Sequence, residues 1–227
     1  MSVNPGSRGG VAHLVETMAR LRAPGGCPWD AGQDHRTLVP YLLEEAYEAV
    51  EAIEHGDRLD LREELGDVLL QVVFHASIAG DDPSDPFDLD DIAAAVADKL
   101  VRRHPQVFAA AAAEPVSAEE SHRRWDRIKA QEKSRRSVLD GVPAGQSALA
   151  RAQKIFARAR RAGLETVTTA SGGGSDLGER LASLAREADA RGLDAEQELR
   201  AATRRLEARI RNHEALEMST KSKEGGA

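Results

Sequence analysis

At 227 residues, with 4% aromatic residues and abundant alanine, leucine, arginine and glutamate, the chain favours packed helices in one domain or two small ones over a β-sandwich. The formal net charge of −7 argues against stable nucleic-acid binding and permits local carboxylate clusters that attract cations. The lone Cys27 excludes an internal disulfide, and the lack of a signal sequence or a membrane-length apolar run predicts a cytoplasmic protein without membrane segments.

The first three predicted helices carry apolar residues at helical spacing. They span about residues 11–21, 40–55 and 59–79. A Pro-Gly-Gly break follows the first helix, and a short turn at Gly56 separates the second from the third. The short turn between the second and third helices therefore predicts that they form an antiparallel hairpin within an all-α helix bundle.

Two further helices are predicted towards the middle of the chain. Asp88 is a candidate N-cap for a helix that ends at His104, before a proline. Ser117 and Glu120 resemble a capping box, which would open a helix that reaches Lys129.

The C-terminal part of the chain shows two more helical patterns after a break at Gly163. A Ser- and Gly-rich stretch predicts a flexible linker over residues 164–175. Helices are expected over 177–190 and 195–214, followed by a polar, disordered tail over 215–227.

Five acidic residues form paired faces on the second and third helices. Glu44 and Glu45 lie within one turn of Glu48, and Glu64 lies three residues before Asp67. Because the acids alternate with apolar residues, packing of the hairpin should gather them in the groove between the helices. Clustered carboxylates repel unless they bind a cation, and Mg²⁺ prefers such oxygen ligands. By spacing alone, a solvated acidic face remains the alternative.

Basic and aromatic residues later in the chain are candidate substrate ligands. Lys99 and Arg103 lie one turn apart with Arg102 beside them, so they could face a phosphate group, with ordinary surface charge as the alternative. Trp125 and Lys129 are also one turn apart and could stack a base and hold a phosphate, with simple packing as the alternative.

Three other residues are given structural roles. Trp29 could serve as a platform or brace the loop before the acidic helix. His75 is expected to be a packed, hydrogen-bonded residue and not a ligand, and Cys27 to be structural.

Several separate motifs occur in an order that closely resembles the MazG family of nucleoside triphosphate pyrophosphohydrolases. They are GGCPWD from Gly25, YLLEEAYE from Tyr41, EELGD from Glu63, QVVFHA from Gln71, KLVRRHPQVF from Lys99 and WDRIKAQEK from Trp125. The resemblance covers about residues 11–163. It implies an all-α, usually dimeric fold that converts a nucleoside triphosphate and water to the monophosphate and pyrophosphate with Mg²⁺, for which Mn²⁺ would substitute.

The resemblance also assigns residues and a division of the chain. The family's EExxE and ExxD metal motifs fall on Glu44, Glu45, Glu48, Glu64 and Asp67. It makes residues 1–163 the catalytic unit that binds metal and nucleotide. It also favours Trp125 and Lys129 as substrate ligands over simple packing.

The C-terminal helices look like a degenerate second MazG half. The segment from Asp176 to Leu181, which includes Glu179, echoes the one from Glu64 to Leu69, but no first acidic helix precedes it. We therefore expect one active site per chain, with residues 176–214 retained for packing or dimerisation.

Two alternatives stay open. One is a metal-dependent phosphohydrolase on the same scaffold that forms a different product. The other is a non-catalytic helical module that only dimerises.

Overall fold

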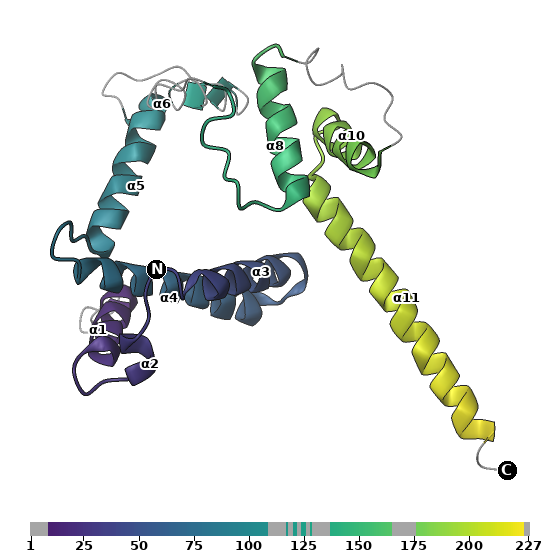
Figure 1. Cartoon of the computed structure of the whole chain (residues 1–227), viewed down its shortest axis with the longest axis horizontal. Helices are drawn as coiled ribbons and strands as arrows, with labels where there is room; N and C mark the ends of the chain where they lie inside the picture. The colour runs from purple at the N-terminus through teal and green to yellow at the C-terminus, as the bar shows by residue number, and fades with distance from the viewer. Residues whose placement is uncertain are drawn as a thin grey trace. The chain divides into compact units, whose positions relative to one another are not determined.

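A computed structural model describes residues 9–108, 117, 120, 121, 124, 125, 128, 137–164 and 176–224, with side chains to residue 218. In these residues every regular element is a helix, which confirms the predicted all-α class (Figure 1). The chain divides into two compact units, residues 1–126 and 127–227. None of the described helices combines the length and the apolar character needed to cross a membrane.

The first unit contains six described helices. They are α1 (Gly10–Arg22), α2 (Pro28–Ala31), α3 (Val39–His55), α4 (Arg58–Gly80), α5 (Leu89–Arg103) and α6 (Pro105–Phe108). Figure 1 shows α3 and α4 side by side, as the predicted hairpin requires.

The turn between α3 and α4 is fixed by Gly56 and Asp57. A Cβ atom at Gly56 would lie 2.8 Å from both the Cα and the carbonyl oxygen of Ala52, so only glycine fits this close approach. The Asp57 carboxylate accepts from the backbone N–H groups of Leu59 and Asp60, and Asp60 accepts in return from the N–H of Asp57. This capping box starts α4 directly after the turn.

The core of the first unit surrounds the C-terminal half of α4. Met18 from α1 and Leu38 from the loop before α3 pack with Val73 and Phe74, and all four are at most 3% exposed. Leu89 at the start of α5 packs against this core. The N-terminal half of α4 is therefore left to pair with α3, and this half carries the acidic residues.

The helix after Asp88 forms as predicted, and a further short helix follows it. Asp88 and Asp91 make a reciprocal capping box. Pro105 ends α5 but also begins α6, because proline is tolerated in a first helical turn. Farther on, the Ser117 hydroxyl accepts from the N–H of Glu120 at 3.1 Å, as the predicted cap requires.

The second unit contains α8 (Ala148–Arg161), α10 (Leu177–Ala190) and α11 (Ala195–Glu224). The Gln153 side chain ties α8 to the α10–α11 turn: it donates to the carbonyl of Leu193 and accepts from the N–H of Ala195. Arg160 on α8 pairs with Asp189 on α10 at 2.9 Å.

The structure adds detail about α8 and about the end of the last helix. The helix α8 packs its amphipathic face against α10 and lies in the second compact unit, and the assignment of residues 1–163 to the catalytic unit stays a prediction. We expected a helix end at Glu214 and a disordered tail beyond it, whereas α11 continues to Glu224, because its polar side chains do not interrupt a helix. Most of the predicted linker, residues 165–175, lies outside the described residues.

Candidate metal and nucleotide site

Three of the predicted carboxylates meet in the groove between α3 and α4. Each of Glu45, Glu48 and Glu64 offers a carboxylate oxygen within 4.8 Å of the others. Glu45 and Glu64 are half-buried, whereas Glu48 is exposed. The hairpin thus brings together acids that lie up to 19 residues apart in the sequence.

The pKa values of two of these acids report their crowding. The pKa of Glu45 is raised above its usual 4.5, first by desolvation and then by the negative charges of Asp67 and Glu48. The pKa of Glu64 is raised by desolvation and then by Glu48 and Asp67. Because neighbouring carboxylates contribute to both shifts, the acids form one electrostatic cluster, and Asp67 belongs to it.

Glu44 and Asp67 occupy the edges of this cluster. Glu44 is exposed on α3, and its charge adds to the raised pKa of Glu45. Asp67 is half-buried on α4, one turn after Glu64. The structure therefore groups all five predicted acids electrostatically, with the trio of Glu45, Glu48 and Glu64 at the centre.

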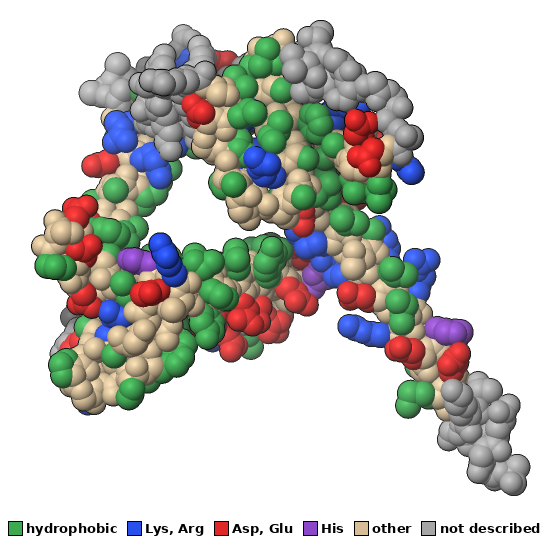
Figure 2. All heavy atoms as spheres, in the orientation of Figure 1, with side chains coloured by type: hydrophobic (Ala, Val, Ile, Leu, Met, Phe, Trp, Pro, Cys, Tyr) green, Lys and Arg blue, Asp and Glu red, His purple; other side chains and the backbone are tan. Residues whose placement is uncertain are grey.

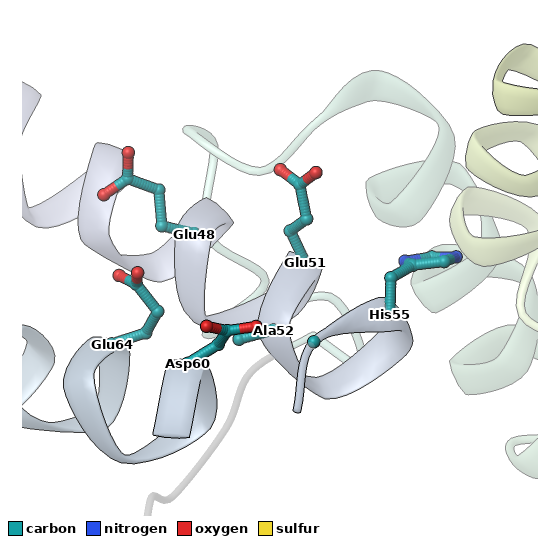
Figure 3. Close-up of a pocket in the computed structure, with 7 residues that line it drawn as sticks. Glu48, Glu51, Ala52, His55, Asp60 and Glu64 are labelled. Carbon is teal, nitrogen blue, oxygen red and sulfur yellow. The ribbon is translucent and has the colours of Figure 1, made fainter. Parts of the chain in front are cut away.

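A pocket of about 370 Å³ opens beside the cluster, towards the α3–α4 turn. Its lining residues are Glu48, Glu51, Ala52, His55, Gly56, Asp60 and Glu64. Figure 3 shows the carboxylates of Glu48 and Glu64 at one side of this pocket, with Glu51 and Asp60 nearby. Glu51 and Asp60 were not among the predicted site residues, although Glu51 follows Glu48 by one helical turn and so could have been placed on the same face.

The cluster fits a hard divalent cation. Its donors are all carboxylate oxygens, which Mg²⁺ prefers, and they lie within 4.8 Å of one another. Desolvation and then the neighbouring carboxylates raise the pKa values of Glu45 and Glu64, and a bound cation would offset both effects. Small side-chain rotations would bring the three oxygens onto one ion.

The predicted basic residues lie elsewhere in the first unit. Leu89, at the start of α5, packs against the core that includes Val73 and Phe74, which lie about 14–15 Å along α4 from Glu64. Figure 1 shows α5 leading away from the α3–α4 hairpin. Lys99 is half-buried and Arg102 exposed at the far end of α5. Within one chain, the structure does not bring them to the carboxylates.

Arg103 and Trp125 contact each other. Arg103 is 6% exposed as a residue. Its guanidinium lies 5.0 Å from the centre of the Trp125 ring, at cation–π distance. The predicted partner of Trp125, Lys129, lies outside the described residues.

The structure places Trp29, whose role was left open, among three aromatic rings. We call this group, Trp29 with Tyr41 and Phe74, the aromatic corner. The Trp29 ring meets Tyr41 at 5.7 Å and Phe74 at 6.4 Å, edge to face in both cases. Tyr41 was not singled out, although it precedes Glu45 by four residues and so lies on the same face of α3.

His75 is hydrogen-bonded as expected. Its Nδ1 lies 2.8 Å from Nδ1 of His35, so one ring donates and the other accepts. This hydrogen bond ties the loop before α3 to α4.

Comparison with known proteins identifies the family. The profile of the MazG nucleotide pyrophosphohydrolase domain matches residues 33–108, which contain the whole carboxylate cluster. The chain is 52% identical over 199 residues to the uncharacterized 26.1 kDa protein in the blaB 3′ region of Streptomyces cacaoi, covering 87% of this chain and 79% of that protein.

The names of two similar proteins state an enzymatic activity. The chain is 49% identical over 163 residues to the nucleoside triphosphate pyrophosphohydrolase of Mycolicibacterium smegmatis and 47% identical over 162 residues to that of Escherichia coli K12. Each match covers 70% of this chain, but only 48% and 60% of those proteins. On this similarity, and on the carboxylate groove that it contains, the chain belongs to the MazG family of nucleotide pyrophosphohydrolases.

Proposed function

We propose that the chain hydrolyses ribo- or deoxyribonucleoside triphosphates to the monophosphate and pyrophosphate in a Mg²⁺-dependent reaction. The observation that carries this proposal is the trio of Glu45, Glu48 and Glu64. The relatives named as nucleoside triphosphate pyrophosphohydrolases support the choice of reaction. By converting triphosphates to monophosphates, the reaction would remove triphosphates from the nucleotide pool.

The proposed metal ligands are the five acids of the EExxE and ExxD motifs, Glu44, Glu45, Glu48, Glu64 and Asp67. When bound, Mg²⁺, or Mn²⁺ in its place, would neutralise phosphate charge and favour attack by water. The chain's own part is to hold these carboxylates on two rigid, packed helices, so that little reorganisation is needed on binding.

The proposed substrate ligands are Lys99, Arg102, Arg103, Trp125 and Lys129. The basic residues would contribute charge to the polyphosphate, since each offers a cationic donor. The Arg103–Trp125 contact supports treating these two as one unit.

A homodimer would complete this arrangement. Figure 2 shows hydrophobic side chains gathered over α3 and α4, on the side of the hairpin away from the acids. Leu43, Tyr47, Ile53 and Leu65 are each at least 50% exposed. Large apolar side chains that are open on one hairpin favour burial against a second copy. A partner chain would also be a source for basic residues that α5 holds away from its own groove.

The reaction can be tested by mixing the purified protein with Mg²⁺ and a panel of triphosphates and resolving the products. Monophosphate plus pyrophosphate, lost in Glu45→Ala and Asp67→Ala but retained in Glu63→Ala, is the expected result. Monophosphate without pyrophosphate, or diphosphate, would indicate a different phosphohydrolase. No turnover by the folded protein would favour the non-catalytic dimerisation module.

A further inference from the structure

The groove that holds the carboxylates leads to an aromatic corner at one end. Tyr41 lies one turn before Glu45 on α3, so their Cα atoms are about 6 Å apart along the helix axis. On α4, Phe74 lies seven residues after Asp67, about 10 Å along the axis. The corner is therefore one or two helical turns from the acids on both helices.

The other end of the groove has different chemistry. The pocket towards the α3–α4 turn is lined by Glu51 and Asp60 in addition to Glu48 and Glu64, and the one ring in its lining is the imidazole of His55. Carboxylates there can accept hydrogen bonds from hydroxyl groups, but they offer no surface for stacking. The opposite end of the groove offers the indole of Trp29 beside the phenol ring of Tyr41, which together form a larger π-surface than one imidazole.

Trp29 presents an open surface at this corner. Its side chain is 51% exposed and that of Tyr41 is 38% exposed, whereas Phe74 behind them is 3% exposed. Edge-to-face contacts at interplanar angles of 86° and 80° fix the indole plane and still leave half of the residue open. A loop brace alone would not require so large an exposed aromatic area.

The backbone that carries Trp29 is held in place. Gln33 Nε2 donates to the carbonyl of Trp29 at 3.0 Å, and Arg22 Nη1 donates to that of Asp30 at 3.2 Å. Pro28 begins the single turn of α2 and restricts its backbone. Because the ring is fixed before a ligand arrives, stacking on it loses little conformational entropy.

Trp125 is engaged in a different way. The Arg103 guanidinium already lies over its ring at 5.0 Å. One face of this indole is thus occupied by a cation. Trp29 meets Tyr41 and Phe74 in T-shaped contacts, and among the described residues no cation lies over its ring.

We infer that Trp29, flanked by Tyr41, is the surface on which the nucleobase of the substrate stacks when its phosphates lie at the carboxylate cluster. This inference rests on the proposed nucleotide hydrolysis. Stacking uses the π-face that all bases share, so the corner favours nucleotides over base-free phosphates, and purines over pyrimidines because their rings are larger.

The two tryptophans of the chain allow a direct test by fluorescence. In Trp125→Phe only Trp29 emits, and in Trp29→Phe only Trp125 emits. We expect AMP with Mg²⁺ to quench the emission of Trp125→Phe, and inorganic pyrophosphate to leave it unchanged. Quenching that occurs only in Trp29→Phe would assign the base to Trp125 and overturn the inference.

Kinetics separate this inference from the proposed function. Trp29→Ala should raise KM for ATP about tenfold, since one stacked base contributes a loss of this order. Cleavage of inorganic triphosphate should change less than twofold, and Trp29→Phe should restore most of the affinity for ATP. Phe87→Ala, which removes another exposed ring between α4 and α5, is the matched control.

The outcomes are distinguishable. Normal hydrolysis with an unchanged KM in Trp29→Ala would overturn the stacking surface and leave the reaction intact. AMP-dependent quenching of Trp29 without hydrolysis of any triphosphate would support the stacking surface and remove the reaction. Circular dichroism confirms that each variant is folded.

Discussion

A carboxylate oxygen of Glu48 on α3 lies within 4.8 Å of one of Glu64 on α4, so the two helices face each other here through like charges. The charge of Glu48 contributes to the raised pKa of Glu64. The hairpin is held by apolar contacts and by its capped turn, and it tolerates repulsion at this point. A site that is unfavourable without a cation is suited to bind one.

Glu48→Gln should therefore stabilise the metal-free protein and abolish its response to metal. Removing one charge relieves the repulsion on Glu64, so the thermal midpoint without Mg²⁺ should rise. Added Mg²⁺ should then raise the midpoint in the wild type but not in the variant, and activity should fall by about a hundredfold or more. Scanning calorimetry with and without Mg²⁺ measures the effect, and Glu63→Gln, which removes a weaker contribution to the same pKa shift, should raise the midpoint less and keep the response to Mg²⁺. A variant that is less stable than the wild type without metal would contradict this account.

His75 should make the stability depend on pH. Its pKa is lowered below the usual 6.5, first by desolvation and then by His35. The unfolded chain therefore binds a proton more readily than the folded protein, and the free energy of unfolding should decrease as the pH falls below 6.5 towards the lowered value. Above 6.5 this contribution is fully present.

Urea unfolding between about pH 7.5 and pH 5.5 measures the slope. His75→Phe should make it shallower, because the group that gains the proton is absent. His13→Phe, which removes an exposed histidine from α1, should leave the slope unchanged. An equal slope in His75→Phe would show that other groups cause the pH dependence.

Gly56 and Gly66 should respond in opposite ways to alanine. At Gly56 the added Cβ would lie 2.8 Å from the Ala52 backbone, so the turn must shift and the protein should lose about 1–3 kcal/mol. At Gly66, inside α4, nothing lies within 4 Å of the added Cβ, so alanine should stabilise the helix by about 0.5–1 kcal/mol. Denaturant titration of both variants measures the difference. Equal effects would mean that the turn at Gly56 is not as tight as described.

Arg22 should matter far more than the aspartate with which it pairs. Its side chain is 10% exposed, donates to Asp81 at 2.7 Å and to the carbonyl of Asp30, and lies over the Phe74 ring at 5.7 Å. Arg22→Ala should cost about 1–3 kcal/mol, since a mostly buried cation with several contacts is removed. Asp81 is 70% exposed, so Asp81→Ala should cost less than about 1 kcal/mol. Similar losses in both variants would make the ion pair itself the main contribution.

The sequence predicted the features that depend on local spacing. The α3–α4 hairpin and the acids on its faces follow from helical periodicity, because residues three and four apart must share a face. The caps at Asp88 and Ser117 were also predictable, since capping depends on a few neighbouring residues.

The rest depends on contacts between distant segments. Periodicity shows that α8 has an apolar face but not that α10 covers it, so the packing of α8 in the second compact unit could not be predicted. The aromatic corner joins Trp29 in a loop to Tyr41 on α3 and Phe74 on α4, and no pattern in the sequence specifies that meeting. The distance of the basic end of α5 from the groove likewise follows from where α5 packs on α4.

The most direct test of the central claim is a titration of the purified protein with Mg²⁺, or with Mn²⁺ as a spectroscopic substitute, followed by calorimetry. We predict one saturable class of sites per chain, lost in Glu48→Gln combined with Glu64→Gln and unchanged in Asp176→Asn combined with Glu179→Gln. Binding that survives removal of Glu48 and Glu64, or a second equivalent class that disappears with Asp176 and Glu179, would contradict the assignment of the site to the α3–α4 groove.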